Sequence, residues 1–270
     1  MNSTPNRNTF TKRRHTPVVM QWNCAGLQSR FAELVLYLMS VPIPILALCE
    51  AGLPNHRTIP GYLKYSNPTM SGFPNGSAAL FVRKTLPQYS LDVSDLCCEH
   101  LEVVVAQISV NDKPLCVGSI YARPGKSGLP VARTIYELNK RCPSPLLLCG
   151  DWNAHRELWG SARRDARGMA LAAALEDCDF VVANDGNPTF FRSPNTYSVL
   201  DITAHTMDLV VTWQVFADSM GSDHFPVFLD LQGYRSSRQR TANVIIWDIF
   251  RSKLEVITEG ISKAIILPPT

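Results

Sequence analysis

The sequence PLLLCGDWNAH at residues 145–155 predicts a buried strand followed directly by a polar turn. The apolar run 145–149 has the length of a short buried strand, and Gly150 then breaks it. A carboxylate, a carboxamide and an imidazole follow, and the carboxyl ends of strands are where α/β proteins bind ligands. In an extended segment Asp151 and Asn153 would point to the same side. A surface turn is the alternative interpretation, because Gly, Asp and Asn are ordinary turn residues.

The composition around this stretch is that of a globular protein. The 270 residues are 46% hydrophobic and 18% charged, which is enough for one large or two small domains and argues against global disorder. The net charge of +3 does not by itself indicate a nucleic-acid-binding protein. The 8 cysteines include no C-x-x-C pair, and several lie in apolar runs. This favours reduced, buried thiols in an intracellular protein over a zinc site or a disulfide framework.

One predicted domain lies between two tails. Residues 1–16 are polar, carry no secretory signal and are expected to form a disordered tail, whose basic triplet at 12–14 is either solvated or in contact with nucleic acid. Residues 17–232 hold the strand and helix patterns of the domain. Residues 233–270 are expected to form a basic linker and a C-terminal amphipathic segment. No membrane span is expected, because prolines interrupt the long apolar run at 34–48.

Apolar periodicity predicts the individual elements of the domain. The expected strands are 17–21, 44–49, 76–82, 101–110, 115–121, 145–149, 180–183 and 227–231, with a further strand-like run at 198–200. The expected helices are 29–39, 131–138 and 168–178. Residues 53–74 are rich in Pro, Gly and aromatic residues and are expected to form a loop.

Polar residues recur where the strand-like runs end. They are Asn23, Glu50, Tyr121, Asp151, Asn153, Asp201, Asp223 and His224. Each alone has an ordinary structural explanation, such as a turn cap or a solvated strand end. If the strand ends converge, the set offers hard oxygen ligands for an ion such as Mg²⁺, which takes one or two carboxylates and leaves room for a substrate phosphate. With an aspartate to activate water and a histidine to donate to a phosphate oxygen, the set predicts metal-assisted hydrolysis of a phosphate ester.

These motifs resemble those of a known family. GDWNAH at 150–155 with the following Trp-Gly, Pro-Thr-Phe at 188–190, Ser-x-x-Asp at 198–201 and SDHFP at 222–226 occur in that order. Residues 18–231 are similar to the endonuclease/exonuclease/phosphatase superfamily, specifically to the endonuclease domain of jockey-like non-LTR retrotransposons of the arthropod kind. The resemblance implies an α/β (α+β) four-layer sandwich, in which two packed mixed β-sheets are flanked by helices.

The resemblance also implies metal-binding residues. Glu50 matches the metal-binding glutamate, Asn23 the asparagine beside it, and Asp223 an aspartate near the metal and the leaving group. The implied cofactor is Mg²⁺ or Mn²⁺. Related repair endonucleases carry an aspartate where this chain has Ala25, so we expect fewer ligands and a modest metal affinity.

Catalytic roles follow from the same resemblance. Asp151 matches the residue that activates or positions water, and Asn153 orients the phosphate. Tyr121 matches a tyrosine that contacts the scissile phosphate. Asp201 matches the aspartate that pairs with the catalytic histidine, His224.

Four further residues are expected to contact DNA or phosphate. Thr189 lies in a segment that is near the DNA backbone in such enzymes. Arg163, Arg164 and Arg167 follow the predicted catalytic loop and either form a solvated helix start or contact backbone phosphates.

The implied function is a divalent-metal-dependent endonuclease that nicks double-stranded DNA and leaves a 3′-hydroxyl, which primes reverse transcription at a retrotransposon insertion site. A downstream reverse transcriptase domain is the implied partner, so the chain is expected to be part of a longer element or a truncated copy. A DNA substrate implies the nucleus, with the cytoplasm as the alternative. The competing hypotheses are an abasic-site repair endonuclease, a phosphoinositide-type phosphatase of the same fold, and a silent nucleic-acid-binding remnant.

Overall fold

The computed structural model describes residues 18–54, 57–67, 77–125, 128–143, 145–192 and 196–234. The chain divides into two units, Met1–Ser236 and Ser237–Thr270, and all described residues lie in the first. The predictions for 1–16 and for 235–270 lie outside the described residues, and the predicted domain boundaries stay predictions. In the described part, no helix combines the length and hydrophobicity that a membrane crossing requires.

The first of two six-stranded sheets is built around a parallel pair. Its strands are β1 (Val19–Asn23), β2 (Ile45–Cys49), β3 (Tyr62–Tyr65), β4 (Ala79–Arg83), β13 (Val211–Val215) and β14 (Val227–Leu231). They are arranged in the order β13-β14-β1-β2-β4-β3. β1 and β2 are parallel and the other neighbours are antiparallel, so the sheet is mixed. β1 therefore lies between β2 and β14, with Val19 opposite Leu229.

The second six-stranded sheet has the same mixed character. Its strands are β5 (Gln88–Leu91), β6 (Leu101–Val110), β7 (Lys113–Ala122), β8 (Leu146–Asp151), β9 (Phe180–Val182) and β12 (Asp201–Thr206), in the order β5-β6-β7-β8-β12-β9. Only β7 and β8 are parallel neighbours among these described strands. A separate hairpin consists of β10 (Phe190–Arg192) and β11 (Thr196–Ser198).

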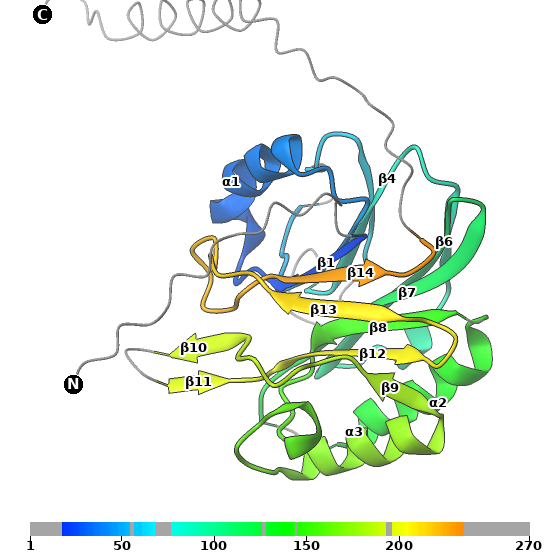
Figure 1. The fold of residues 1–270 in the computed structure, drawn as a ribbon, viewed down its shortest axis with the longest axis vertical. Helices are drawn as coiled ribbons and strands as arrows, with labels where there is room; N and C mark the ends of the chain where they lie inside the picture. Colours follow the sequence, from blue (N-terminus) through cyan, green and yellow to red (C-terminus); the bar gives the residue numbers. More distant parts are fainter. Residues whose placement is uncertain are drawn as a thin grey trace, which may run out of the picture. The chain divides into compact units, whose positions relative to one another are not determined.

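Helices cover the outer faces of the two sheets (Figure 1). The α-helices are α1 (Leu27–Ser40), α2 (Leu129–Arg141) and α3 (Ala166–Asp177), and the 3-10 turns are η1 (Ser94–Leu96) and η2 (Glu157–Trp159). Side chains of α1 share an apolar core with the first sheet, and side chains of α2 and α3 share another with the second. A third core, between them, is formed by strands of both sheets. The predicted four-layer sandwich of two mixed sheets flanked by helices is therefore confirmed.

Strand alternation produces these layers. In β8, Leu146 and Leu148 pack in the core beneath α2 and α3, whereas Leu147 and Cys149 pack between the sheets. Successive side chains of a strand point to opposite faces, so the next residue on the inner face is Asp151. The buried strand thus ends with a carboxylate directed into the sandwich.

Eight of the fourteen described strands and the three helices lie where the periodicity predicts them, whereas six strands were missed. β3 lies inside the segment expected to be a loop, and the other strands that were not predicted are β5, β10, β11, β12 and β13. β3 and β5 are edge strands with only one buried residue between them, so their sequences carry little apolar alternation.

The position of Asp201 corrects a prediction. The run 198–200 is not a strand that ends at Asp201, because Asp201 is the first residue of β12. β12 is antiparallel to β8 and pairs Asp201 with Asp151. An antiparallel strand begins at the edge where its neighbour ends, so Asp201 still reaches the predicted edge.

Candidate active site

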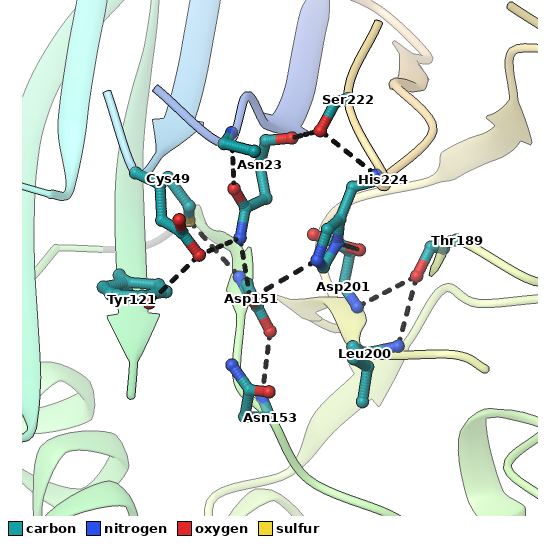
Figure 2. Close-up of polar contacts among 12 residues, drawn as sticks. Asn23, Cys49, Tyr121, Asp151, Asn153, Thr189, Leu200, Asp201, Ser222 and His224 are labelled. Carbon is teal, nitrogen blue, oxygen red and sulfur yellow. Dashed lines mark hydrogen bonds and ion pairs between the residues drawn. The ribbon is translucent and has the colours of Figure 1, made fainter. Parts of the chain in front are cut away.

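The polar residues at the strand ends meet at one edge of the sandwich, and Figure 2 shows Asp151 between Asn23 and His224. Asn23 ends β1, Asp151 ends β8, and Asp201 begins β12. His224 lies in the loop before β14, which is antiparallel to β1. Residues from both sheets thus build one site, although they are far apart in the sequence.

Asn23 links two carboxylates of this site. Its Nδ2 donates hydrogen bonds to Glu50 Oε1 at 2.9 Å and to Asp151 Oδ2 at 2.8 Å. The backbone N–H of Ala25 donates to Asn23 Oδ1 at 3.0 Å, which fixes the orientation of the amide. Tyr121 OH donates to the same Glu50 Oε1 at 3.0 Å. The amide and the phenol therefore hold neighbouring negative charges in place and reduce their repulsion.

His224 is held by a buried carboxylate. Its Nδ1 lies 2.6 Å from Asp201 Oδ2, and its Nε2 lies 3.9 Å from Asp151 Oδ2. An ionised carboxylate only accepts hydrogen bonds, so Nδ1 carries a proton and Nε2 faces Asp151. The Phe190 ring packs against the imidazole with centroids 4.8 Å apart.

Burial and neighbouring charges shift the pKa values of several residues at the site. Burial alone would lower the pKa of His224, but Asp201, Asp151 and Asp223 outweigh it and raise the pKa to about 9. Burial raises the pKa of Asp151 to about 7, against the opposing effect of His224. Burial and the Glu50 charge raise the pKa of Tyr121, so its hydroxyl stays a neutral donor. The site therefore places an imidazolium beside a carboxylate with an increased affinity for protons.

Non-glycine residues with left-handed backbone surround the site. Glu50 (φ 50°), Asn153 (φ 45°), Ala25 (φ 43°) and Met220 (φ 50°) lie in its loops. Such conformations cost roughly 1–3 kcal/mol each and persist only where surrounding contacts enforce them. Because the extended strand ends at Asp151, the prediction that strand periodicity aligns Asn153 with it is wrong. Asn153 is instead fixed by its own N–H, which donates to Asp151 Oδ1 at 3.0 Å, and by Nδ2, which donates to the Ala122 carbonyl at 3.0 Å.

The predicted metal ligands are only partly brought together. Among the described residues, no group of three or more His, Cys, Asp or Glu side chains is arranged to hold a metal ion. Asn23 turns its amide nitrogen, not its oxygen, toward the carboxylates, so the structure corrects its assignment as a ligand. Asp223 is exposed, and Glu50 is partly exposed at the site. One partly exposed carboxylate still fits Mg²⁺ or Mn²⁺, because Mg²⁺ retains several waters and also binds substrate phosphate.

Two of the predicted DNA contacts are buried. The side chain of Thr189 has no exposed surface, and its Oγ1 accepts hydrogen bonds from the backbone N–H groups of Leu200 and Asp201, both at 3.1 Å. Thr189 therefore supports Asp201 instead of facing DNA. Arg167 is only 4% exposed and donates to backbone carbonyls. Both assignments as surface DNA contacts are corrected by this burial.

The other two arginines are exposed. Arg163 NH2 donates to His155 Nε2 at 2.8 Å, which requires that nitrogen to be unprotonated. Burial and Arg163 lower the pKa of His155, in agreement with a neutral ring. Arg164 forms a surface ion pair with Glu157. These two guanidinium groups are the members of the predicted cluster that solvent and a ligand can reach.

Sequence reasoning missed several supporting residues. Ser222 Oγ donates to the Asn23 carbonyl at 2.8 Å and accepts from the His224 N–H at 3.1 Å, so it links the first strand to the histidine loop. Gln21 donates to the Gly150 carbonyl at 3.3 Å and accepts from Thr203 Oγ1 at 2.6 Å, which joins the two sheets behind Asp151. The position of Ser222 beside the Asp-His pair was an available signal, whereas nothing in the sequence indicated the partners of Gln21.

Comparison with known proteins identifies one family match and several relatives. Residues 115–228 match the family described as Endonuclease-reverse transcriptase. The chain is 25% identical, over 79% of its length, to the probable RNA-directed DNA polymerase from transposon BS of Drosophila melanogaster. It is 24% identical, over 78% of its length, to the RNA-directed DNA polymerase from mobile element jockey of Drosophila funebris. It spans about a quarter of these relatives, 24% and 23% of their lengths.

A solved structure resembles the whole described domain. The endonuclease domain of TRAS1, a telomere-specific non-LTR retrotransposon, superimposes with a TM-score of 0.69 at 25% identity. The match covers 79% of this chain and 97% of that one. The similarity therefore extends over nearly the entire neighbouring domain.

Proposed function

We propose that the chain, which resembles the endonuclease domain of jockey-like non-LTR retrotransposons, is a divalent-metal-dependent endonuclease that cleaves phosphodiester bonds in double-stranded DNA. The observation that carries the proposal is the buried chain of contacts from Asp201 through His224 to Asp151, with His224 Nε2 3.9 Å from Asp151 Oδ2. This chain of contacts places a proton acceptor, Asp151, next to a cationic proton donor, His224.

In the proposed reaction, the charge of each side chain determines whether it accepts or donates a proton. Asp151 takes a proton from the attacking water, and its raised pKa strengthens it as an acceptor. His224, held protonated by Asp201, donates to a phosphate oxygen as negative charge develops there. Tyr121 and Asn153 orient the phosphate through their polar groups.

A divalent cation such as Mg²⁺ or Mn²⁺, when bound at Glu50, supplies positive charge that stabilises the charge on the phosphate oxygens. The donor set supports this role because Glu50 Oε1 is already oriented by Asn23 and Tyr121. Asp223, an exposed carboxylate in the His224 loop, stays a predicted second ligand.

The proposed biological role is the nicking of target DNA for retrotransposon integration, so that the new 3′-hydroxyl primes reverse transcription. The similarity to TRAS1 and to RNA-directed DNA polymerases of mobile elements supports this role. In a full-length element we expect a downstream reverse transcriptase domain as the functional partner. The DNA substrate places the proposed site of action in the nucleus.

A plasmid assay tests the proposed activity. We expect the chain to convert supercoiled plasmid to the nicked form with Mg²⁺, and to leave it supercoiled with EDTA. Cleavage confined to abasic oligonucleotides would favour a repair enzyme, and release of phosphate from phosphoinositides would favour a phosphatase. DNA binding without cleavage in any of these assays would identify a silent remnant.

The metal requirement predicts the behaviour of a Glu50 variant. Glu50→Gln is expected to raise the Mg²⁺ concentration for half-maximal nicking by about tenfold or more, since even indirect partners of a metal ligand contribute 10–100-fold to affinity. A titration of nicking rate against Mg²⁺ measures this shift. Glu137→Gln is the matched control, because Glu137 pairs with Lys140 and Arg141 on the surface of α2. An unchanged Mg²⁺ requirement in Glu50→Gln would remove that carboxylate from the metal site.

The exposed arginines predict a change in salt dependence. Replacing Arg163 and Arg164 with glutamine is expected to weaken DNA binding and to reduce the slope of log Kd against log salt by about one per lost phosphate contact. Fluorescence anisotropy with a DNA duplex in EDTA measures binding apart from cleavage. Lys140→Gln is the control, since α2 runs from the end of β7 to the start of β8 and Lys140 lies at the edge opposite the site. A slope equal to that of the control would place both arginines outside the interface.

A further inference from the structure

Arg167 is a charged residue whose surroundings do not suit the DNA contact that its sequence position indicates. It is the second residue of α3, and only 4% of its surface is exposed. Burying a guanidinium is costly unless hydrogen bonds compensate for the lost water. The partners of this side chain therefore indicate what it does.

Its partners are backbone carbonyls beside the catalytic strands. NH1 donates to the carbonyls of Trp152 and Asn153, both at 3.2 Å, and NH2 donates to the carbonyl of Arg123 at 2.8 Å. Trp152 and Asn153 directly follow the end of β8, and Arg123 directly follows the end of β7. One guanidinium thus joins the two segments that leave this parallel strand pair at the site edge.

These carbonyls belong to the strained part of the site. Asn153 has a left-handed backbone (φ 45°), and its N–H donates to the Asp151 carboxylate. Two consecutive carbonyl oxygens that converge on one point repel each other unless a hydrogen-bond donor lies between them. The guanidinium of Arg167 supplies this donor as a planar fork of N–H groups that serves several acceptors at once. A lysine ammonium lacks this planar geometry.

The backbone around Arg167, at the start of α3, is fixed to the loop that follows β8. Asp165 caps α3 by accepting from the Gly168 N–H, and it also accepts from the His155 N–H at 3.2 Å. At Gly168, a Cβ atom would lie 2.1 Å from the His155 carbonyl oxygen, so the helix backbone packs directly on the loop. The start of α3 and residues 152–155 therefore form one rigid unit.

We propose that Arg167 is a positioning residue of the phosphodiester-cleaving site, which holds the main chain of Asn153 beside Asp151 and does not bind DNA. This inference rests on the proposed nuclease function. It differs from a phosphate contact in a measurable way. A phosphate contact requires mainly positive charge, which lysine retains, whereas the positioning role requires the fork.

The experiment compares Arg167→Lys and Arg167→Gln with Arg163→Gln and with the unmodified protein. We expect both Arg167 variants to lower kcat for plasmid nicking by about 10–100-fold, because small misplacements of catalytic groups have effects of that size. KM and the salt slope of DNA binding in EDTA should stay unchanged for both. Arg163→Gln should instead reduce the salt slope.

Each remaining outcome decides against the inference. A wild-type kcat in Arg167→Lys would show that charge suffices, and a salt slope reduced by about one in Arg167→Gln would make Arg167 a phosphate contact. If neither variant shows a cooperative thermal transition, Arg167 is required for folding, and the positioning role is rejected. If the unmodified protein does not nick DNA, the proposed function fails by itself, and an altered salt slope in Arg167→Gln still overturns the inference separately.

Discussion

Replacing Asp151 with asparagine is expected to slow DNA nicking by about 10²–10⁴-fold, the range that a general base contributes. Asparagine has nearly the same shape, but it cannot take a proton from water. Asn23 Nδ2 can still donate to the remaining side-chain oxygen, whereas the Asn153 N–H loses its acceptor Oδ1. The rate of plasmid nicking under single-turnover conditions measures the loss of the chemical step.

This variant should fold as well as the unmodified protein. Asp151 is 1% exposed, and burial disfavours its charged form more than His224 favours it, so removing its charge relieves a cost of folding. We expect an unchanged or higher melting temperature alongside the lost activity. Asp112→Asn is the control, since Asp112 lies in the exposed turn before β7, at the edge opposite the site. Retention of full activity in Asp151→Asn would refute its role as the base.

Replacing His224 with alanine is expected to lower both activity and stability. Nicking should slow by about 10²–10³-fold, the effect of removing one donor to a developing charge. The Asp201 carboxylate would also lose the partner of its Oδ2, while its Oδ1 has no hydrogen-bond partner among the described residues. Breaking a buried pair in this way costs roughly 3–5 kcal/mol of the free energy of unfolding. Plasmid nicking and urea unfolding measure the two effects.

A double variant separates these two effects. Adding Asp201→Asn to His224→Ala removes the unpaired buried charge, so most of the lost stability should return while nicking stays slow. His100→Ala is the control, because His100 is a partly exposed histidine beside Glu99. If the double variant recovers activity together with stability, His224 acts through the fold and not through the phosphate.

The inner strands of the fold could be predicted because their environment leaves a strong pattern in the sequence. The run ahead of Gly150 is buried on both faces and reads as continuous apolar sequence, and so does β2. The edge strands β3 and β5 face solvent and carry weak patterns, so sequence alone did not reveal them. Strand direction was also hidden, which explains why Asp201 was placed at the end of a run and not at the start of β12.

The candidate site could be predicted as a set of residues but not as a set of contacts. The resemblance supplied the identities of Asp151, His224 and Glu50, and the structure brings them to one edge. Which way an amide points depends on partners distant in sequence, so the orientation of Asn23 could not be inferred. The same holds for Thr189 and Arg167, whose polar types suggest solvent until their buried carbonyl and N–H partners are known.

The pairing of β1 with β14 has a consequence for synthesis on the ribosome. β1 leaves the ribosome early, but its neighbour β14 is synthesised much later. Val19 therefore cannot pair with Leu229 until nearly the whole domain has been made. A nascent or prematurely terminated polypeptide that ends before His224 also lacks β14, and one that ends between them leaves β1 without its β14 neighbour. We therefore expect incomplete translation products to be unable to cut the genome of the cell that makes them.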